Sequence, residues 1–551
     1  MLSVGLNWLY ITLTIFCVGY GIEYLMEKWL HYRIRRLDSI LMAGLVAVTV
    51  YAEVFSLFYK VGAIANLVLL LVCAVVLFLL HRQIWKSLGE WWKEISVVKK
   101  VLIPILFLLW AFFTSRGYIH IDTDLYHAQN IRWIEEYGVV PGLGNLHERF
   151  AYNSSFFPLS ALYSMKFLVG KSLHTVSGFF AFLLSITALN ITMSWKKRQI
   201  SLSNYARVGA IYYLTTIVDE VVSPASDYPI MCIIFFIVIK WLDSLEEEKE
   251  SAPFSLLCVM GVYALTLKLT AGLILLLLVK PAYSLIKKKR IKDIFLYLGM
   301  GIAVAVPWFV RTIVISGWLL YPFPKLDLFQ VDWKMDAALI EVDAAQISAW
   351  GKALYNISLL DTPITQWLPN WFRSTLSGTE KLLILGNVIC ILVFIGAAVW
   401  VFSKKKWKEL DMLLVLGTLV CSYLFWQLSA PLMRYGYAYV LLLDFVTIGW
   451  LFTRLNWKRL QNIIYFVLIF YGFYKLFVMG KYIYGCRLVE CYIWQADYGT
   501  YELESYEIDG VTFYKPVVGA LTGYDLFPAA PTQADIELRG DGLKDGFRRR
   551  Q

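Results

Sequence analysis

Residues 382–402, LLILGNVICILVFIGAAVWVF, contain no charged side chain, and Lys404, Lys405 and Lys406 follow almost directly. An α-helix of roughly 20 residues is about 30 Å long, which matches the hydrocarbon thickness of a membrane. Because the run is continuous rather than alternating, it indicates a spanning helix and not a barrel strand. The lysines mark a cytoplasmic loop under the positive-inside rule. This stretch predicts a helical membrane protein.

The rest of the chain has the same character. Of its 551 residues, 59% are hydrophobic and 17% are charged, whereas soluble domains contain about a quarter charged residues. The net charge of +10 comes from short basic clusters between apolar runs. No single basic patch forms, so we expect no nucleic acid partner.

Apolar runs of this kind predict an all-α polytopic protein with about 14 transmembrane helices. The predicted spans are residues 4–25, 39–58, 61–80, 101–115, 172–194, 208–218, 228–242, 253–267, 269–286, 294–316, 382–402, 410–428, 433–451 and 460–479. The segments 208–218 and 228–242 are short, and such a pair could also form a re-entrant hairpin, which leaves the sidedness of the other spans unchanged.

Basic residues predict the sidedness of the loops. The clusters fall in residues 28–36, 82–100, 196–207, 287–292, 404–408 and 454–459, all on one side of the fourteen-span arrangement. The opposite side then carries both termini and three larger polar segments, 116–171, 317–381 and 480–551. We expect the first side to be cytoplasmic and the second to be the outer face of a bacterial inner membrane.

The first outer segment contains the densest group of chemically active side chains. Residues 123–137 read as an amphipathic helix, with Asp122 as its N-cap and Gly138 as its C-terminal stop. Asp124 and His127 fall near one face of that helix. A carboxylate beside an imidazole suits general-base catalysis or metal binding, although a capping aspartate and a surface histidine would explain the same pattern.

Further ionisable residues lie near the outer ends of other spans. They are the acids Asp219, Glu220 and Asp227 and the cations Lys268, Arg311 and Arg434. Charges within spans are costly and by default mark functional or paired sites, while snorkelling to the lipid head groups is the structural alternative. Acids in loops and cations at the lipid boundary suit an anionic, lipid-borne substrate, because Arg and Lys bind phosphate.

This arrangement resembles the GT-C superfamily of membrane glycosyltransferases. That family's seven-span module has a long outer loop after its first span and another after its seventh, as 116–171 and 317–381 would be here. More specifically, the chain is similar to a bacterial membrane family related to GT-C enzymes. The motifs that carry this likeness are Tyr126 to Glu136, Pro141 to Leu146, Asn153 to Ser155, Pro307 to Arg311, Tyr321-Pro322 and Pro431 to Tyr435.

The resemblance implies a domain organisation and an activity. Three spans (1–100) would precede the module (101–316), followed by the second outer loop (317–381), four spans (382–479) and an outer tail (480–551). The expected reaction moves a sugar from a polyprenyl-phosphate donor to a glycan, lipid or protein acceptor. The chain departs from the family in its three leading spans and in Asp122-Thr-Asp124, where many relatives have adjacent Asp-Glu.

The resemblance also implies roles for the candidate residues. Asp122 or Asp124 would be the base, and Arg311, Arg434 and Lys268 would hold the donor phosphate. The acceptor side would be lined by His127, Asp219, Glu220 and Asp227, with Arg116 as a further substrate-binding candidate. A divalent metal, Mg²⁺ or Mn²⁺, is possible on His120, Asp122, Asp124 and His127, and no other cofactor is expected.

Two rival activities differ in what they need. A polysaccharide polymerase or O-antigen ligase relies on arginines in a late outer loop, and 317–381 contains only Arg373. A lipid or solute transporter often shows repeated halves, and no repeat is evident. The tail is expected to be a small α/β or β-rich cap, in which a Cys486–Cys491 disulfide is plausible but not established.

Overall fold

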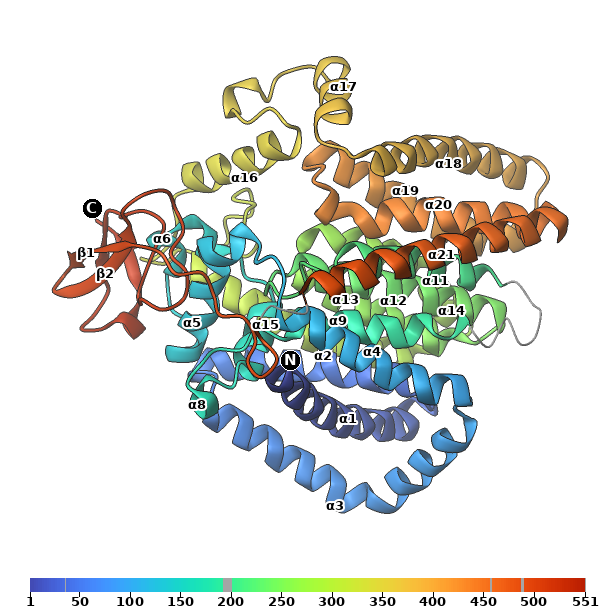
Figure 1. Ribbon diagram of the computed structural model, residues 1–551, viewed down its shortest axis with the longest axis horizontal. Helices are drawn as coiled ribbons and strands as arrows, with labels where there is room; N and C mark the ends of the chain where they lie inside the picture. Colours follow the sequence, from blue (N-terminus) through green and yellow to red (C-terminus); the bar gives the residue numbers. More distant parts are fainter. Residues whose placement is uncertain (35, 192–200, 456–457, 487–489, 551) are drawn as a thin grey trace.

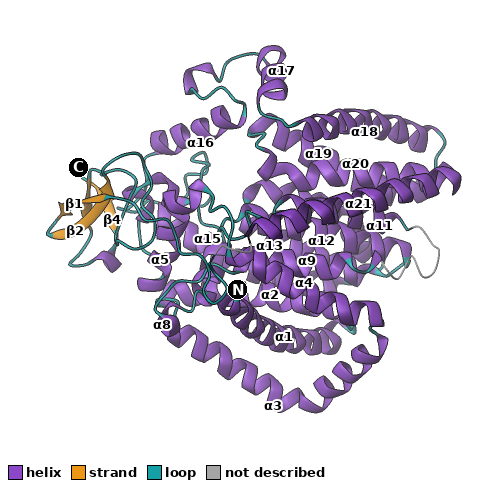
Figure 2. Ribbon diagram, in the orientation of Figure 1, coloured by secondary structure: helices purple, strands orange, loops and turns teal. Residues whose placement is uncertain are grey.

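The computed structural model describes residues 1–34, 36–191, 201–455, 458–486 and 490–550, and most of them are helical (Figure 1). The long helices form one bundle, with a small region of β-structure at one end (Figure 2). In the described part of the chain, ten helices are long and apolar enough to cross a membrane. The prediction of a polytopic helical membrane protein is confirmed.

The bundle helices follow the order of the apolar runs. The N-terminal group is α1 (Leu2–Leu30), α2 (Leu37–Phe58), α3 (Ala63–Glu94) and α4 (Val97–Ser115). The middle group is α9 (Val176–Ala188), α11 (Leu202–Thr216), α12 (Asp227–Glu246), α13 (Ser251–Leu267), the 3-10 helix η3 (Leu269–Leu278), α14 (Val279–Lys287) and α15 (Ile291–Ser316). The C-terminal group is α18 (Gly378–Ser403), η5 (Trp407–Glu409), α19 (Leu410–Ser429), α20 (Met433–Leu455) and α21 (Lys458–Cys486).

All fourteen predicted spans fall on helices, although residues 192–194 of one lie outside the described residues. The helices α9, α11 and α13 have 13, 15 and 17 residues, fewer than the roughly 20 that a crossing usually needs. Fourteen crossings therefore stay a prediction. Of the bundle helices, α12 is buried along nearly its whole length, as expected of a helix that is apolar on every side.

Close packing of α1 against α2 depends on two glycines. A Cβ atom on Gly19 would lie 2.2 Å from the Ile40 carbonyl oxygen, and one on Gly44 would lie 1.7 Å from the Ile15 carbonyl oxygen. Neither contact is possible for a larger residue without moving backbone. Small residues at a helix interface allow this approach in membranes, where van der Waals contact drives association.

The three larger polar segments fold at one end of the bundle. Residues 116–171 form η1 (Thr123–His127), α5 (Ala128–Glu136), α6 (Leu143–Leu146), η2 (Glu148–Ala151), α7 (Phe156–Tyr163) and α8 (Lys166–Val169). Residues 317–381 form α16 (Ala337–Gly351), η4 (Ile357–Leu359) and α17 (Ile364–Ser374), and they end in the first turn of α18. The tail forms the antiparallel pair β1 (Leu503–Ile508) and β2 (Val511–Pro516), η6 (Leu543–Asp545), and a second antiparallel pair, β3 (Ile536–Leu538) and β4 (Phe547–Arg549).

Both termini lie at this same end, which we call the cap end. The Met1 amino group donates to the Cys491 carbonyl over 2.6 Å, and Arg549 pairs with Asp336 at 2.7 Å. The loops joining α1 to α2, α3 to α4 and α18 to α19 lie at the opposite end (Figure 1). The predicted grouping of termini and polar segments is confirmed, and the compartment that the cap end faces stays a prediction. Cys486 and Cys491 are free thiols.

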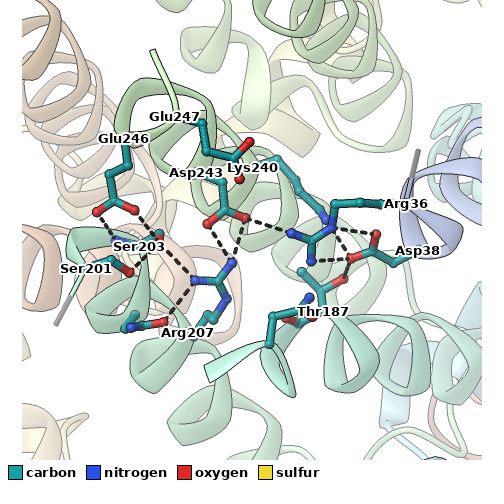
Figure 3. Close-up of polar contacts among 12 residues, drawn as sticks. Arg36, Asp38, Thr187, Ser201, Ser203, Arg207, Lys240, Asp243, Glu246 and Glu247 are labelled. Atoms are coloured by element: carbon teal, nitrogen blue, oxygen red, sulfur yellow. Dashed lines mark hydrogen bonds and ion pairs between the residues drawn. The ribbon is translucent and has the colours of Figure 1, made fainter. Parts of the chain in front are cut away.

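A buried network of ion pairs holds the opposite end together (Figure 3). Arg207 of α11 donates to both carboxylate oxygens of Asp243 at 2.6 Å, and Lys240 of α12 pairs with Asp38 at 2.6 Å. Arg36 lies 3.7 Å from Asp243 and 3.4 Å from Asp38. We call these five residues the inner network. Of the basic residues predicted on this side, Arg35, Lys196, Lys197 and Arg198 lie outside the described residues.

Candidate functional site

The predicted amphipathic helix of the first outer segment is present, but it begins differently. Asp122 stands at the N-cap position of η1, but it has helical backbone angles and its side chain makes no capping hydrogen bond. A π-helical turn, η1, follows it and leads into α5. Gly138, with φ of +83°, does end the helix as predicted. Because a π turn widens the helix, it re-aims the side chains around it, and such turns are frequent at functional sites.

Asp122 is free of capping because its carboxylate binds a cation on another helix. The Arg434 guanidinium, at the start of α20, donates to Asp122 over 2.6 Å and lies 3.5 Å from Asp227 at the start of α12. Lys268, between α13 and η3, also pairs with Asp227. We call these four residues, together with His120 and His127, the Arg434 cluster. Its charged members come from four separate parts of the chain.

The two histidines of the cluster are held differently. The Nδ1 atom of His120 accepts from the Asp122 amide over 3.1 Å, and Arg434 contacts the same ring. His127 is buried, its ring packs 5.4 Å from that of Phe157, and its Nδ1 has no hydrogen-bond partner among the residues that the structure describes. Burial lowers the pKa of His127 to about 4, so its imidazole is neutral near pH 7 and can accept a hydrogen bond from a ligand hydroxyl.

Electrostatic contacts set the charge of Asp122. Burial by itself would raise the pKa of Asp122. The attraction of Arg434, together with that of the nearby histidines, outweighs burial, so the pKa of Asp122 lies below its usual range. The carboxylate is therefore ionised while Arg434 holds it. Its side chain is 20% exposed, and those of Arg434 and Lys268 are each 22% exposed, so all three can be reached by a ligand.

Sequence reasoning missed four residues beside the cluster. The Tyr435 hydroxyl accepts from Arg434 over 2.9 Å, and Lys268 lies 3.2 Å above its ring. Tyr126 is partly buried, which raises its pKa, and it is close enough to Asp122 for that carboxylate to raise the pKa further. Arg149 pairs at 3.3 Å with Asp343 of α16. Tyr126 and Tyr435 adjoin predicted residues in the sequence, whereas nothing in the sequence links Arg149 to Asp343.

Asp124 does not join the cluster. Its carboxylate accepts from the Tyr501 hydroxyl over 2.9 Å and from the Gly499 amide over 3.2 Å, and its carbonyl accepts from the Thr522 and Gly523 amides. All four donors belong to the C-terminal tail. Burial raises the pKa of Asp124, and no lysine or arginine among the described residues pairs with it. The structure thus separates the two aspartates that the sequence treated as a pair.

Two further candidates make structural contacts elsewhere. Arg116 is buried, donates to the Cys486 carbonyl over 3.1 Å and stacks on the ring of Phe112. Arg311 is buried in α15, where it donates to Ser56 and, over 3.1 Å, to Asn153. Neither arginine contacts the Arg434 cluster through a hydrogen bond or ion pair among the described residues.

The acidic turn before α12 is only partly in the cluster. Asp227 belongs to it, whereas the Asp219 carbonyl accepts from the Tyr118 amide over 2.7 Å. Glu220 receives a hydrogen bond from Tyr228, and burial raises its pKa. No group of three or more His, Cys, Asp or Glu side chains is arranged to hold a metal ion in the described part of the chain. The metal candidates His120, Asp122 and His127 share the cluster, but Asp124 does not.

Comparison with known proteins adds a family. The model of one protein family, described as a domain of unknown function (DUF8201), matches residues 1–441, and the chain therefore belongs to that family. No curated protein and no solved structure matches the chain. The matched region contains every residue of the Arg434 cluster and ends before the tail, residues 480–551.

Proposed function

We propose that this DUF8201 member is an inverting membrane glycosyltransferase that uses a polyprenyl-phosphate-linked sugar. The observation that carries the proposal is Asp122 held by Arg434 beside Lys268, with all three side chains partly exposed at the cap end. A base next to two phosphate-binding cations is what a transfer from a lipid phosphate needs.

In the proposed reaction, the acceptor hydroxyl oxygen bonds to the anomeric carbon while Asp122 takes its proton. The bond between that carbon and the phosphate oxygen breaks, and its electron pair leaves on the polyprenyl phosphate. Arg434 and Lys268 stabilise the charge that develops on this leaving group. Arg434 has the planar fork of donors that fits two phosphate oxygens, and Lys268 contributes a point charge.

The resting ion pair gives the donor a means to activate the base. Without donor, Arg434 holds Asp122 in the ionised, weakly basic state. A donor phosphate competes for the same guanidinium, and loss of that attraction moves the pKa of Asp122 upward. Neutral His127 and the hydroxyl of Tyr126 can each accept a hydrogen bond from the acceptor sugar or donate one to it.

The order of elements supports the same proposal. A module from α4 to α15 has one polar segment after its first helix and a second after its last, as in GT-C enzymes. The two segments meet where Arg149 pairs with Asp343 beside the cluster. We propose that the cap end faces outward from a bacterial inner membrane, where such donors are used.

The test is transfer by the full chain in liposomes with a panel of polyprenyl-phosphate sugars and an envelope extract as acceptor. Mass spectrometry of released polyprenyl phosphate is the readout. We expect Asp122→Asn to lower the rate by a factor on the order of 10²–10⁴, while Asp124→Asn, the matched control, keeps it within a few-fold. Full activity of both variants at normal expression would overturn the proposal.

The same assay separates the rival activities. Movement of the lipid across the bilayer without sugar transfer would identify a transporter. Transfer only from long lipid-linked glycans would identify a polymerase or an O-antigen ligase-like enzyme.

A further inference from the structure

A second polar site lies beside the turn between α2 and α3. A cavity of about 290 Å³ is lined there by Tyr59, Lys60, Val61, Gly62, Ala63 and Ile64 of the turn, and by residues of α5, α7 and α8. This volume approaches that of the smaller ligand sites, which are roughly 300 Å³ and larger. We call it the α2–α3 cavity. Because it opens where two spanning helices end, it lies at the level of the lipid head groups.

Two lysines give the cavity positive charge. Lys60 is exposed on the turn, and Lys166 begins α8 on the opposite wall. Gly62, the N-cap of α3, has no side chain to cap this 32-residue helix. The first backbone N–H groups of α3 therefore have no capping side chain and can donate hydrogen bonds to a ligand. Each of these features favours an anionic ligand.

Two carboxyl groups also line the cavity, and neither pairs with Lys60 among the described residues. Glu136 is paired with Lys166. Glu135 is buried and accepts from the Ser172 hydroxyl over 2.8 Å and from the Tyr524 hydroxyl of the tail. Burial raises the pKa of Glu135. Lys60 is thus the cation that a ligand meets first.

The rim of the cavity indicates a lipid rather than a soluble anion. Ile64 and Phe167, which line it, are 51% and 47% exposed, and the neighbouring Phe58 and Leu168 are 77% and 73% exposed. Tyr59 is also exposed on the same turn, and tyrosines are enriched at this depth of a membrane. Cations beside exposed apolar side chains match a phosphate head group with acyl chains.

We propose that the α2–α3 cavity binds the phosphate head group of an anionic membrane lipid, with Lys60 and Lys166 on the phosphate and Ile64 and Phe167 against the chains. The site does not depend on the proposed glycosyl transfer. It is, however, connected to the Arg434 cluster, because Glu135 lies eight residues after His127 on one helix, a distance of about 12 Å. A lipid held here is within reach of the same face of the protein.

The experiment is native mass spectrometry of the full chain titrated with phosphatidylglycerol or phosphatidylcholine. The wild-type protein should bind phosphatidylglycerol at least tenfold more tightly. Lys60→Glu should remove most of this preference, and Ala63→Trp, which fills the cavity from the first turn of α3, should weaken both lipids. Lys325→Glu makes the same charge change on an exposed lysine of the second polar segment and should leave binding unchanged.

Inorganic phosphate distinguishes the source of the ligand. At millimolar concentration it should not displace phosphatidylglycerol, and displacement would show that the site takes free phosphate instead. Equal binding of the two lipids by the wild-type protein, or unchanged phosphatidylglycerol binding by both Lys60→Glu and Ala63→Trp, would overturn the proposal. If Lys60→Glu does not fold, Ala63→Trp and the wild-type lipid preference still decide. None of these readouts depends on sugar transfer.

Discussion

The Arg434 cluster and the inner network contain the same kinds of residue but differ in how their charges are satisfied. In the inner network, Arg207 donates to both oxygens of Asp243, and the side chains of Arg207, Asp243 and Lys240 are 4%, 11% and 8% exposed. In the Arg434 cluster, Arg434 divides its contacts among four partners, Asp122, Asp227, His120 and Tyr435, and remains 22% exposed.

This difference separates a structural ion-pair network from a binding site. The Arg207–Asp243 and Lys240–Asp38 pairs are nearly shielded from water, whereas Arg36 at their edge is 35% exposed. Removing one partner of a buried pair strands the other. The Arg434 cluster keeps unused capacity in the unpaired Nδ1 of His127 and in cations that a ligand can reach. Both regions are made of ionisable residues near membrane spans, so residue type alone did not distinguish them.

The largest effect should come from breaking the inner network. Asp243→Asn leaves Arg207 buried without a full counter-charge, and we expect a loss of about 3–5 kcal/mol in unfolding free energy. Thermal unfolding and the yield of monodisperse protein in detergent measure it. Glu250→Gln, at a residue whose side chain is 75% exposed at the same end, is the control and should have little effect. A small loss for Asp243→Asn would mean that this network is as adaptable as the Arg434 cluster.

In contrast to Asp243→Asn, Arg434→Gln should lower sugar transfer strongly and affect stability less. Loss of the phosphate-binding fork should lower kcat/KM for transfer by a factor on the order of 10²–10³, about 2.7–4 kcal/mol in transition-state stabilisation. Arg434→Lys should recover only part of this, because an ammonium group lacks the fork. Folding should be affected less than by Asp243→Asn, since Asp122 becomes solvated in the partly open site. Unchanged kcat/KM in a folded Arg434→Gln protein contradicts the assignment of this cluster as the site.

Acidic pH should act on the Arg434 cluster through His127. The pKa of His127 is about 4 in the folded protein, below the ordinary 6.5. Between pH 4 and pH 6.5 the unfolded chain therefore binds a proton at this histidine that the folded chain does not. Stability should therefore fall by about 1.4 kcal/mol per pH unit as the pH drops through this window. The charged and titratable neighbours are Asp122, Asp227, His120 and Arg434.

The measurement is the unfolding temperature of the wild-type protein and His127→Gln at several pH values from 7 to 4. His120, His147 and His174 also have lowered pKa values and contribute slopes of the same sign. His127→Gln should remove the contribution of His127 to the slope of stability against pH and leave the contributions of the other three histidines. Identical slopes for the two proteins would show that His127 is not held neutral by burial.

Much of the fold followed from the sequence because membrane insertion depends on local properties. Apolar run length predicted the helices, and the lysine and arginine clusters predicted which segments gather at the cap end. The same rule placed Asp122, Asp227, Lys268 and Arg434 on one face. It could not pair them, since Asp122 and Arg434 are 312 residues apart and their contact depends on how α20 packs.

Asp122, Arg116 and Arg311 are held by partners that the sequence does not reveal. Asp122 was taken as a cap because aspartate favours that position, but the helix starts earlier and its π turn redirects the side chain. Arg116 and Arg311 have the residue type of phosphate ligands, yet the backbone and side-chain oxygens of Cys486, Ser56 and Asn153 accept their hydrogen bonds. These partners are uncharged, and nothing in their sequence marks them as arginine ligands.

The smallest effect should come from Asp124→Asn. The amide oxygen of Asn still accepts from Tyr501 or Gly499, and the substitution removes a charge whose burial is unfavourable, as the raised pKa of Asp124 indicates. We expect a change in unfolding free energy below about 1 kcal/mol and transfer within a few-fold of wild type. Tyr501→Phe should cost a similar small amount, because it removes the same bond. Should Asp124→Asn abolish transfer while Asp122→Asn retains it, the tail-facing aspartate is the base and the roles drawn from Arg434 are reversed.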